Sequence, residues 1–130
     1  MKALSLTQPW AQACFLNLKH FETRSWSTNY RGPLLIHAAK GFPKYAREFA
    51  ESERALGRGM PSLPFGAIIG QVELINVWKT ENLIFFPNGS LEIIYGDFSP
   101  GRFAWEFQNP VTFPKPIPYR GQQRLFEVEV

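Results

Sequence analysis

The sequence predicts an α+β fold in which five or six short strands form a small, closed or nearly closed β-barrel flanked by two helices. Strand-like apolar patterns, two stretches of helical apolar spacing that follow a proline, and glycines inside strand patterns predict this arrangement. Closing the sheet would remove exposed strand edges. A chain of 130 residues without a linker-like stretch is expected to form a single domain over residues 1–130.

Three strands are predicted in the first half of the chain. They are Ala3–Leu6, Phe21–Trp26 and the continuous apolar run Leu34–Ala39. A continuous apolar run of strand length is typical of a strand that is buried on both faces, and we expect this of Leu34–Ala39.

Two helices are predicted between and after these strands. The first begins with Pro9 and runs to about Leu18, because proline suits the first helical position and apolar residues recur at helical spacing. The second runs from Pro43 to about Leu56, with Gly57 just past its end. Its inner side is predicted to carry Tyr45, Phe49 and Leu56.

The second half is predicted to be mostly β. Gly66–Val77 has the longest strand pattern, and Gly70 within it marks a bulge or a bend. Residues 79–100 are predicted to be irregular, with a turn at 87–89. The remaining extended segments are Phe103–Phe107, Phe113–Pro118 and Leu125–Val130. Because Phe113–Pro118 is rich in proline, it cannot be a central strand.

Composition excludes several classes of protein. Hydrophobic residues are 45% and charged residues 19% of the chain, which excludes disorder. No apolar run is long enough to cross a bilayer, and the first residues do not resemble a secretory signal, so we expect a cytoplasmic protein that does not associate with membranes. Cys14, His20 and His37 cannot supply an internal disulfide or a zinc-finger ligand set, so neither cofactor nor metal is expected. Phosphate-loop, dinucleotide and G-x-S-x-G motifs do not occur, which disfavours ordinary nucleotidases and serine hydrolases.

Charge is distributed unevenly along the chain. Residues 1–58 hold nine basic and four acidic residues, for a net charge of +5, whereas residues 59–130 hold five basic and seven acidic residues, for −2. This asymmetry is compatible with a basic face that meets phosphate, and equally with an ordinary solvated surface.

The densest polar cluster runs from Lys19 to Trp26. In a strand, Glu22, Arg24 and Trp26 would share one face, Thr23 would take the other, and Lys19 could reach the first. These charges are costly to bury unless they are paired. They therefore indicate either a structural ion pair at the barrel rim or a cleft that grips an anionic or polar ligand.

Four further side chains have alternative interpretations. Gln8 stands at a helix N-cap, where glutamine is a poor capping residue, so its amide is a candidate ligand contact. Trp10 could stack on a base or belong to the core, and the same choice stays open for Trp105. His37 is expected to be a hydrogen-bonded core histidine rather than a catalyst, because no serine or cysteine lies near it in the sequence.

Together these segments resemble the ASCH domain, which occurs alone in bacteria and at the C-terminus of a eukaryotic transcription coactivator. The resemblance is carried by ALSLTQPWA at residues 3–11, by Lys19-x-x-Glu22-x-Arg24-Ser25-Trp26 and by YRGPLLIHAA at residues 30–39. Residues 66–74, 103–105 and 115–121 also look like this family. The combination of Gln-Pro-Trp with Lys-x-x-Glu-x-Arg is the specific part of the match.

The resemblance implies a PUA-like fold and a role in binding RNA, single-stranded nucleic acid or a nucleoside-like molecule, with RNA metabolism as the setting. The ligand-binding residues that it implies are Gln8, Trp10, Lys19, Glu22, Arg24, Arg31 and Trp105. The oligomeric state does not follow from it. Two other roles are compatible with the family: a small hydrolase acting on RNA or acylated cytidine, with Lys19 and Glu22 as its catalytic groups, and a protein-interaction module.

The chain departs from the family pattern at two positions. One bacterial group that hydrolyses acylated cytidine has threonine three residues after the lysine, and this chain has Glu22 there. That departure disfavours the acylcytidine activity. The family also favours glycine just before the last strand, where this chain has Arg124. This difference leaves the shape of the loop open and could add a positive charge near the cleft.

Overall fold

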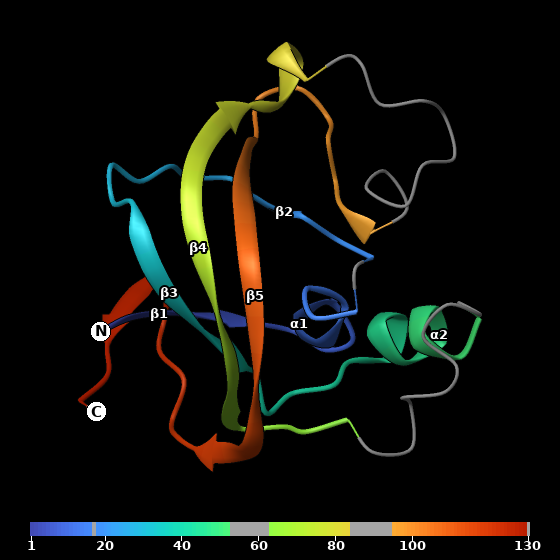
Figure 1. Cartoon of the computed structure of the whole chain (residues 1–130). Coiled ribbons are helices and arrows are strands. Elements are labelled where there is room, and N and C mark those ends of the chain that lie inside the picture. Colours follow the sequence, from blue (N-terminus) through green and yellow to red (C-terminus); the bar gives the residue numbers. More distant parts are fainter. Residues whose placement is uncertain (17, 53–62, 84–94, 130) are drawn as a thin grey trace.

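A six-stranded sheet curls into half a barrel, with two helices on one side of it (Figure 1). The computed structural model describes residues 1–16, 18–52, 63–83 and 95–129. The sheet has the order β2-β5-β4-β3-β1-β6, in which only the β1–β3 pair is parallel. The strands are β1 (Lys2–Leu6), β2 (Phe21–Arg24), β3 (Gly32–Ala38), β4 (Ala67–Lys79), β5 (Phe103–Pro118) and β6 (Leu125–Glu127). The helices are α1 (Trp10–Ala13) and α2 (Lys44–Ser52), with a short 3-10 turn η3 at Thr80–Asn82. This confirms the predicted α+β, PUA-like class.

The sheet carries apolar clusters on both of its faces. Leu34 and Ile36 of β3 belong to the larger cluster, which also holds Trp105. Leu35, between them, belongs to a second cluster with Ile68 and other residues. Since side chains alternate along a strand, β3 is covered on both sides, as its unbroken apolar run predicts.

Gly70 marks an irregularity in the sheet, as predicted. The β4–β5 register shifts between Ile68 and Gly70. A Cβ atom on Gly70 would lie 2.5 Å from both Phe15 Cε1 and the Val111 carbonyl oxygen. Glycine is therefore required here because another backbone and an aromatic ring approach it closely.

Strand β5 joins two segments that the sequence separates. Its pairing with β2 involves only Phe103–Glu106, whereas Ile117 and Pro118 pair with β4 alone. The proline-rich half therefore lies at an edge, as predicted. The two halves form one strand because register shifts absorb the interruption near Asn109, whose φ of 52° is tolerated by asparagine.

The first helix is shorter than the predicted Pro9–Leu18. After Ala13 the amides bond three residues back, from Phe15 to the Gln12 carbonyl and from Leu16 to the Ala13 carbonyl. This tighter pattern ends the α-helix although the apolar spacing continues. Strand β6 likewise ends at Glu127, before the predicted Val130.

The expected inner side of the second helix needs correction. Ala46 and Ala50 are its buried residues, whereas Tyr45 is 65% exposed. Phe49 packs against the cluster of Ala13 and Tyr95, as expected, so the inner side is formed by Phe49 and the two alanines without Tyr45. The predicted helix end at Leu56 and Gly57 and the turn at 87–89 lie outside the described residues.

Candidate functional site

A cleft of about 540 Å³ opens where β2 meets α1, α2 and the segment at residues 95–102. Charged, hydroxyl and aromatic side chains line it together. The lining residues used below are Trp10, Glu22, Arg24, Trp26, Tyr45, Phe49, Asp97 and Arg102. The cleft therefore combines a polar floor with aromatic walls.

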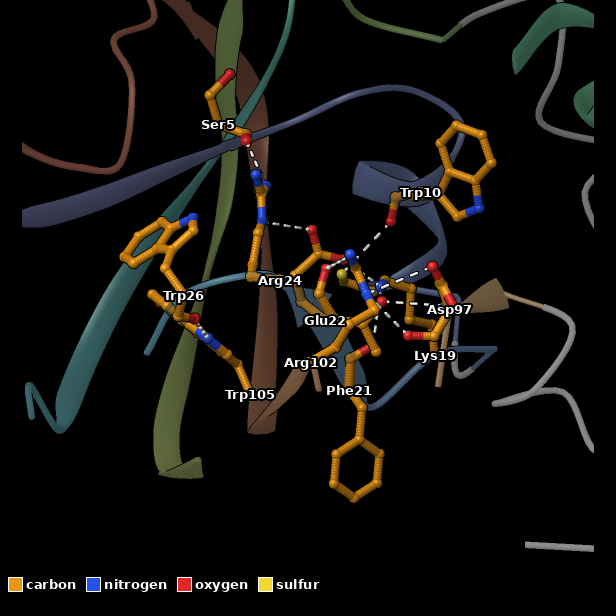
Figure 2. A network of polar contacts seen from close by, with 12 residues as sticks. Ser5, Trp10, Lys19, Phe21, Glu22, Arg24, Trp26, Asp97, Arg102 and Trp105 are labelled. Atoms are coloured by element: carbon orange, nitrogen blue, oxygen red, sulfur yellow. Dashed lines mark hydrogen bonds and ion pairs between the residues drawn. The ribbon is translucent and has the colours of Figure 1, made fainter. Parts of the chain in front are cut away.

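Glu22 of β2 forms the centre of that floor, because cations hold both of its oxygens (Figure 2). Lys19 Nζ lies 2.5 Å from Glu22 Oε1, and it also donates to the Phe21 carbonyl at 2.8 Å. Arg24 Nε lies 3.0 Å from Glu22 Oε2. Strand alternation places Glu22 and Arg24 on one face, and Lys19 reaches the same carboxylate from the turn before β2.

These two cations keep Glu22 ionised. Burial raises the pKa of the Glu22 carboxyl, but the charges and hydrogen bonds of Lys19 and Arg24 outweigh it and leave that pKa below its ordinary value. The Lys19 side chain is 1% exposed, and that of Glu22 is 12% exposed. The group of two cations and one anion presents one net positive charge to the cleft through Arg24.

Arg24 connects this floor to strand β1. Its Nη2 donates to the Ser5 carbonyl at 2.8 Å, and Figure 2 shows the guanidinium between that carbonyl and Glu22. The side chain remains 26% exposed. Arg24 is therefore held in position while part of it faces the cleft.

A second ion pair borders the cleft. Arg102 Nε lies 3.5 Å from Asp97 Oδ2 (Figure 2). Arg102 Nη2 also donates to the Thr23 carbonyl at 3.3 Å. Hydrogen bonds from the hydroxyl and amide of Ser99 lower the pKa of Asp97. The Asp97 amide in turn donates to Thr23 Oγ1 at 3.0 Å. Segment 95–102 is thereby tied to β2.

The helices supply an aromatic wall. The Trp10 ring stacks on Phe49 of α2 at 5.2 Å between centroids, with 26° between the planes. The centroid of the Tyr45 ring lies 6.0 Å from that of Trp10, and Tyr45 is largely exposed. The wall therefore offers a tyrosine face that is open to a planar ligand.

Trp26 borders the cleft opposite these helices and carries a cation on its face. Arg124 Cζ lies 4.9 Å from the Trp26 ring centroid, and the Trp105 ring meets Trp26 edge-on at 4.7 Å. Arg124 has a φ of 57°, the left-handed conformation that glycine adopts most easily. The arginine thus keeps a glycine-like turn and places its charge beside the cleft.

The structure brings together only some of the predicted site residues. Trp10, Glu22 and Arg24 line the cleft, whereas Lys19 lies beneath Glu22 and does not line it. Trp105 is fully buried in the core, with its indole N–H bonded to the Trp26 carbonyl, so it is not part of the lining. Arg31 is exposed and donates to the carbonyls of its own loop, at Thr28 and Tyr30.

The expectation of a free Gln8 amide is also corrected. Gln8 is fully buried, and its Oε1 accepts from the Gln12 amide at 2.9 Å. Its Nε2 donates to the Pro64 carbonyl at 3.0 Å. Both ends of the amide therefore hold the chain together at the start of α1.

Sequence reasoning missed several lining residues. The helical spacing predicts Tyr45 on the core side of its helix, and Asp97 and Arg102 stand in a stretch without a recognisable motif. Their place depends on contacts between distant segments, such as Arg102 with Thr23. In the described ranges, no cluster of three His, Cys, Asp or Glu residues could hold a metal ion, and no helix is long and apolar enough to cross a membrane.

Comparison with known proteins agrees with this architecture. The chain is 29% identical over 133 aligned residues to Activating signal cointegrator 1 of Homo sapiens and, equally, to that of Mus musculus. Those alignments cover 97% of this chain but only 22% of either relative, so the chain spans about a fifth of their length.

Solved structures show the same fold. The crystal structure of ASCH from Zymomonas mobilis matches with a TM-score of 0.60 and 13% sequence identity, covering 98% of this chain and 87% of that one. A mutant form of the same protein matches with a TM-score of 0.59. The ASCH domain model matches residues 4–116. The chain therefore belongs to the ASCH domain family.

Proposed function

We propose that this protein binds single-stranded RNA, or a nucleotide-like ligand, in the cleft around Glu22. The observation that carries the proposal is the Glu22 carboxylate held between Lys19 and Arg24 on the floor of an aromatic-walled cleft. Its setting would be RNA metabolism or its regulation, in the cytoplasm.

The two charged groups have complementary roles in this proposal. An ionised carboxylate only accepts hydrogen bonds, so Glu22 accepts from an exocyclic amine of a base. Arg24 donates to a phosphate or to a base carbonyl, since its guanidinium is partly exposed in the cleft. Lys19 acts as a positioning residue, because its ammonium touches Glu22 and the Phe21 carbonyl beneath the cleft floor.

The aromatic wall suits a base. Tyr45 is 65% exposed and stands beside Trp10, which is itself fixed by stacking on Phe49. Stacking of a base on an aromatic side chain contributes roughly 1–3 kcal/mol without strong sequence preference. Net positive charge at the floor adds an electrostatic attraction for the nucleic-acid backbone.

A hydrolase that uses Lys19 as an acid–base group is less well supported. The Lys19 side chain is 1% exposed and lies behind Glu22, where it cannot meet a substrate held in the cleft. A protein-interaction role, as in the coactivator relatives, would not depend on the cleft and is separated from RNA binding by the experiment below.

The test is fluorescence anisotropy with a labelled single-stranded oligoribonucleotide at several salt concentrations. Wild type should bind with a slope of log K against log salt of about −0.7 for each phosphate contacted. Arg24→Gln should weaken binding at least tenfold, whereas Arg31→Gln removes the same charge outside the cleft and should retain most of the affinity. Equal affinities for both variants, or binding that ignores salt, would contradict the proposal.

A further inference from the structure

A second cavity, of about 620 Å³, lies between strands β1 and β3 and the segment at residues 119–123. Ser5 and His37 line it, together with Lys40, Arg120 and Gly121. Leu4 and Leu6 point into the larger core cluster, so the Ser5 side chain between them points to the opposite face. We call this space the Ser5 cavity. Its residues take no part in the RNA proposal, apart from the Ser5 carbonyl that accepts from Arg24.

The serine and the histidine are brought together by strand pairing. Ser5 and His37 are register partners in the parallel β1–β3 pair, so their side chains share a face. The Ser5 hydroxyl oxygen lies 2.9 Å from His37 Nδ1. The β3–β4 register shifts between Ile36 and His37, directly beside this pair. Such bulges are frequent beside active sites.

The second ring nitrogen fixes the protonation of the histidine. His37 Nε2 lies 2.7 Å from the Tyr119 carbonyl oxygen, which can only accept, so Nε2 carries the proton. In the neutral ring Nδ1 is then the acceptor, and the Ser5 hydroxyl donates to it. The order of groups is serine, histidine and an orienting acceptor, which is the arrangement that activates a serine nucleophile.

The loop after β5 closes tightly over this pair. A Cβ atom on Gly121 would lie 2.7 Å from His37 Cε1 and 3.2 Å from the Ser5 hydroxyl oxygen. His37 is 1% exposed, whereas Ser5 is only partly buried. Glycine therefore lets the backbone hold the imidazole in place while the serine borders the cavity, where Lys40 and Arg120 supply positive charge.

We propose that Ser5 is a nucleophile activated by His37 and that the Ser5 cavity hydrolyses small carboxylic esters that carry a negative charge. The Ser5 oxygen bonds to the ester carbonyl carbon as its proton passes to His37 Nδ1. The carbon–alkoxide bond then breaks, and the leaving alcohol takes that proton. Water next gives a proton to Nδ1 and bonds to the acyl carbon. The serine oxygen leaves with the proton, and the acid is released.

The direct test is modification by diisopropyl fluorophosphate, followed by peptide mass spectrometry. The serine oxygen bonds to phosphorus as the phosphorus–fluorine bond breaks, and hydrogen fluoride leaves. We expect the reagent to label Ser5 in the folded chain. When the chain is unfolded in urea before the reagent is added, Ser5 should stay unlabelled. Ser5→Ala should remove it, while Ser99→Ala, which alters an exposed serine elsewhere, should keep it. No label on Ser5, or equal labelling of the unfolded chain, would overturn the proposal.

Turnover provides the second test. Hydrolysis of 4-nitrophenyl succinate should fall at least a hundredfold in Ser5→Ala, with the melting temperature confirming that the variant folds. The double variant Lys40→Gln/Arg120→Gln should raise KM for this anionic ester and leave the neutral 4-nitrophenyl acetate unaffected. Unchanged succinate hydrolysis in Ser5→Ala would contradict the proposal. Neither result depends on RNA binding, because Tyr45→Ala alters the RNA cleft without touching the Ser5 cavity and should leave both results unchanged.

Discussion

Lys19 Nζ lies 2.5 Å from Glu22 Oε1, in a pair whose lysine side chain is 1% exposed. The partner oxygen of the same carboxylate lies 3.0 Å from Arg24 Nε. Because a buried charge without its partner is costly, the lysine fixes where the carboxylate stands, and the carboxylate fixes the arginine. The chemistry that faces the cleft is thus set by a residue beneath it.

The first prediction concerns Glu22→Gln. Neutralising the carboxylate leaves the Lys19 ammonium buried beside an amide, so we expect the free energy of unfolding to fall by about 3 kcal/mol at neutral pH. Urea denaturation measures this. Glu127→Gln is the control, because Glu127 pairs with Lys2 on an exposed surface. This variant should lower the free energy of unfolding far less than Glu22→Gln does.

The same variant has a defined pH dependence. The Glu22 pKa is lowered on folding, so the stability that its ionisation contributes is present above its ordinary pKa of 4.5 and is lost as pH falls through the folded value. The difference in unfolding free energy between wild type and Glu22→Gln should therefore shrink below about pH 4.5. A constant difference from pH 7 to pH 3 would contradict this assignment.

Tyr45 should matter for binding and not for stability. Its ring is 65% exposed on the cleft side of α2, so Tyr45→Ala should change the free energy of unfolding by less than about 0.5 kcal/mol. Loss of base stacking in Tyr45→Ala should weaken binding of the oligoribonucleotide by roughly 1–3 kcal/mol. Tyr45→Phe keeps the ring and should bind like wild type. If both variants bind equally, the ring is not a stacking surface.

Arg124 tests the turn before β6. Arg124→Ala keeps the unfavourable left-handed backbone and loses the contact with Trp26, whereas Arg124→Gly loses the contact but relieves the strain. The Arg124→Gly variant should therefore be more stable than Arg124→Ala by about 1 kcal/mol. Thermal unfolding of both variants measures the difference, and greater stability of the alanine variant would show that the turn is unstrained.

Gly70→Ala tests the close approach at the sheet irregularity. Its methyl group would lie 2.5 Å from the Val111 carbonyl oxygen, a backbone atom that cannot move aside as a flexible side chain can. We therefore expect the free energy of unfolding to fall by about 2 kcal/mol or more. Gly41→Ala is the matched control, since no heavy atom lies within 4 Å of its added methyl group. Similar effects at both positions would contradict the packing described for Gly70.

Local patterns predicted most of the sheet. The apolar run at Leu34–Ala39, the glycine at 70 and the prolines of Phe113–Pro118 each report on their own strand and its neighbours, and the structure bears out all three. The end of α1 was not predictable in this way, because the apolar spacing continues through a segment whose amides change to shorter hydrogen bonds.

The candidate site was predictable only in part. Glu22 and Arg24 share a strand face, so alternation alone places them together. In contrast, Tyr45, Arg102 and the pairing of Ser5 with His37 depend on contacts between segments that are far apart in the chain. A single sequence contains no local signal for such contacts. The expectation of a buried, hydrogen-bonded histidine at 37 is confirmed, but its partner Ser5 could not be predicted.

The most direct test of the proposed cleft uses the indole N–H signals of the four tryptophans in a ¹H–¹⁵N NMR spectrum, recorded while a single-stranded oligoribonucleotide is added. Trp10 and Trp26 line the cleft, whereas Trp78 does not line it and donates to Glu106. The account predicts that the Trp10 and Trp26 signals shift progressively while the Trp78 signal stays in place. Movement of the Trp78 signal with Trp10 and Trp26 unchanged would contradict it.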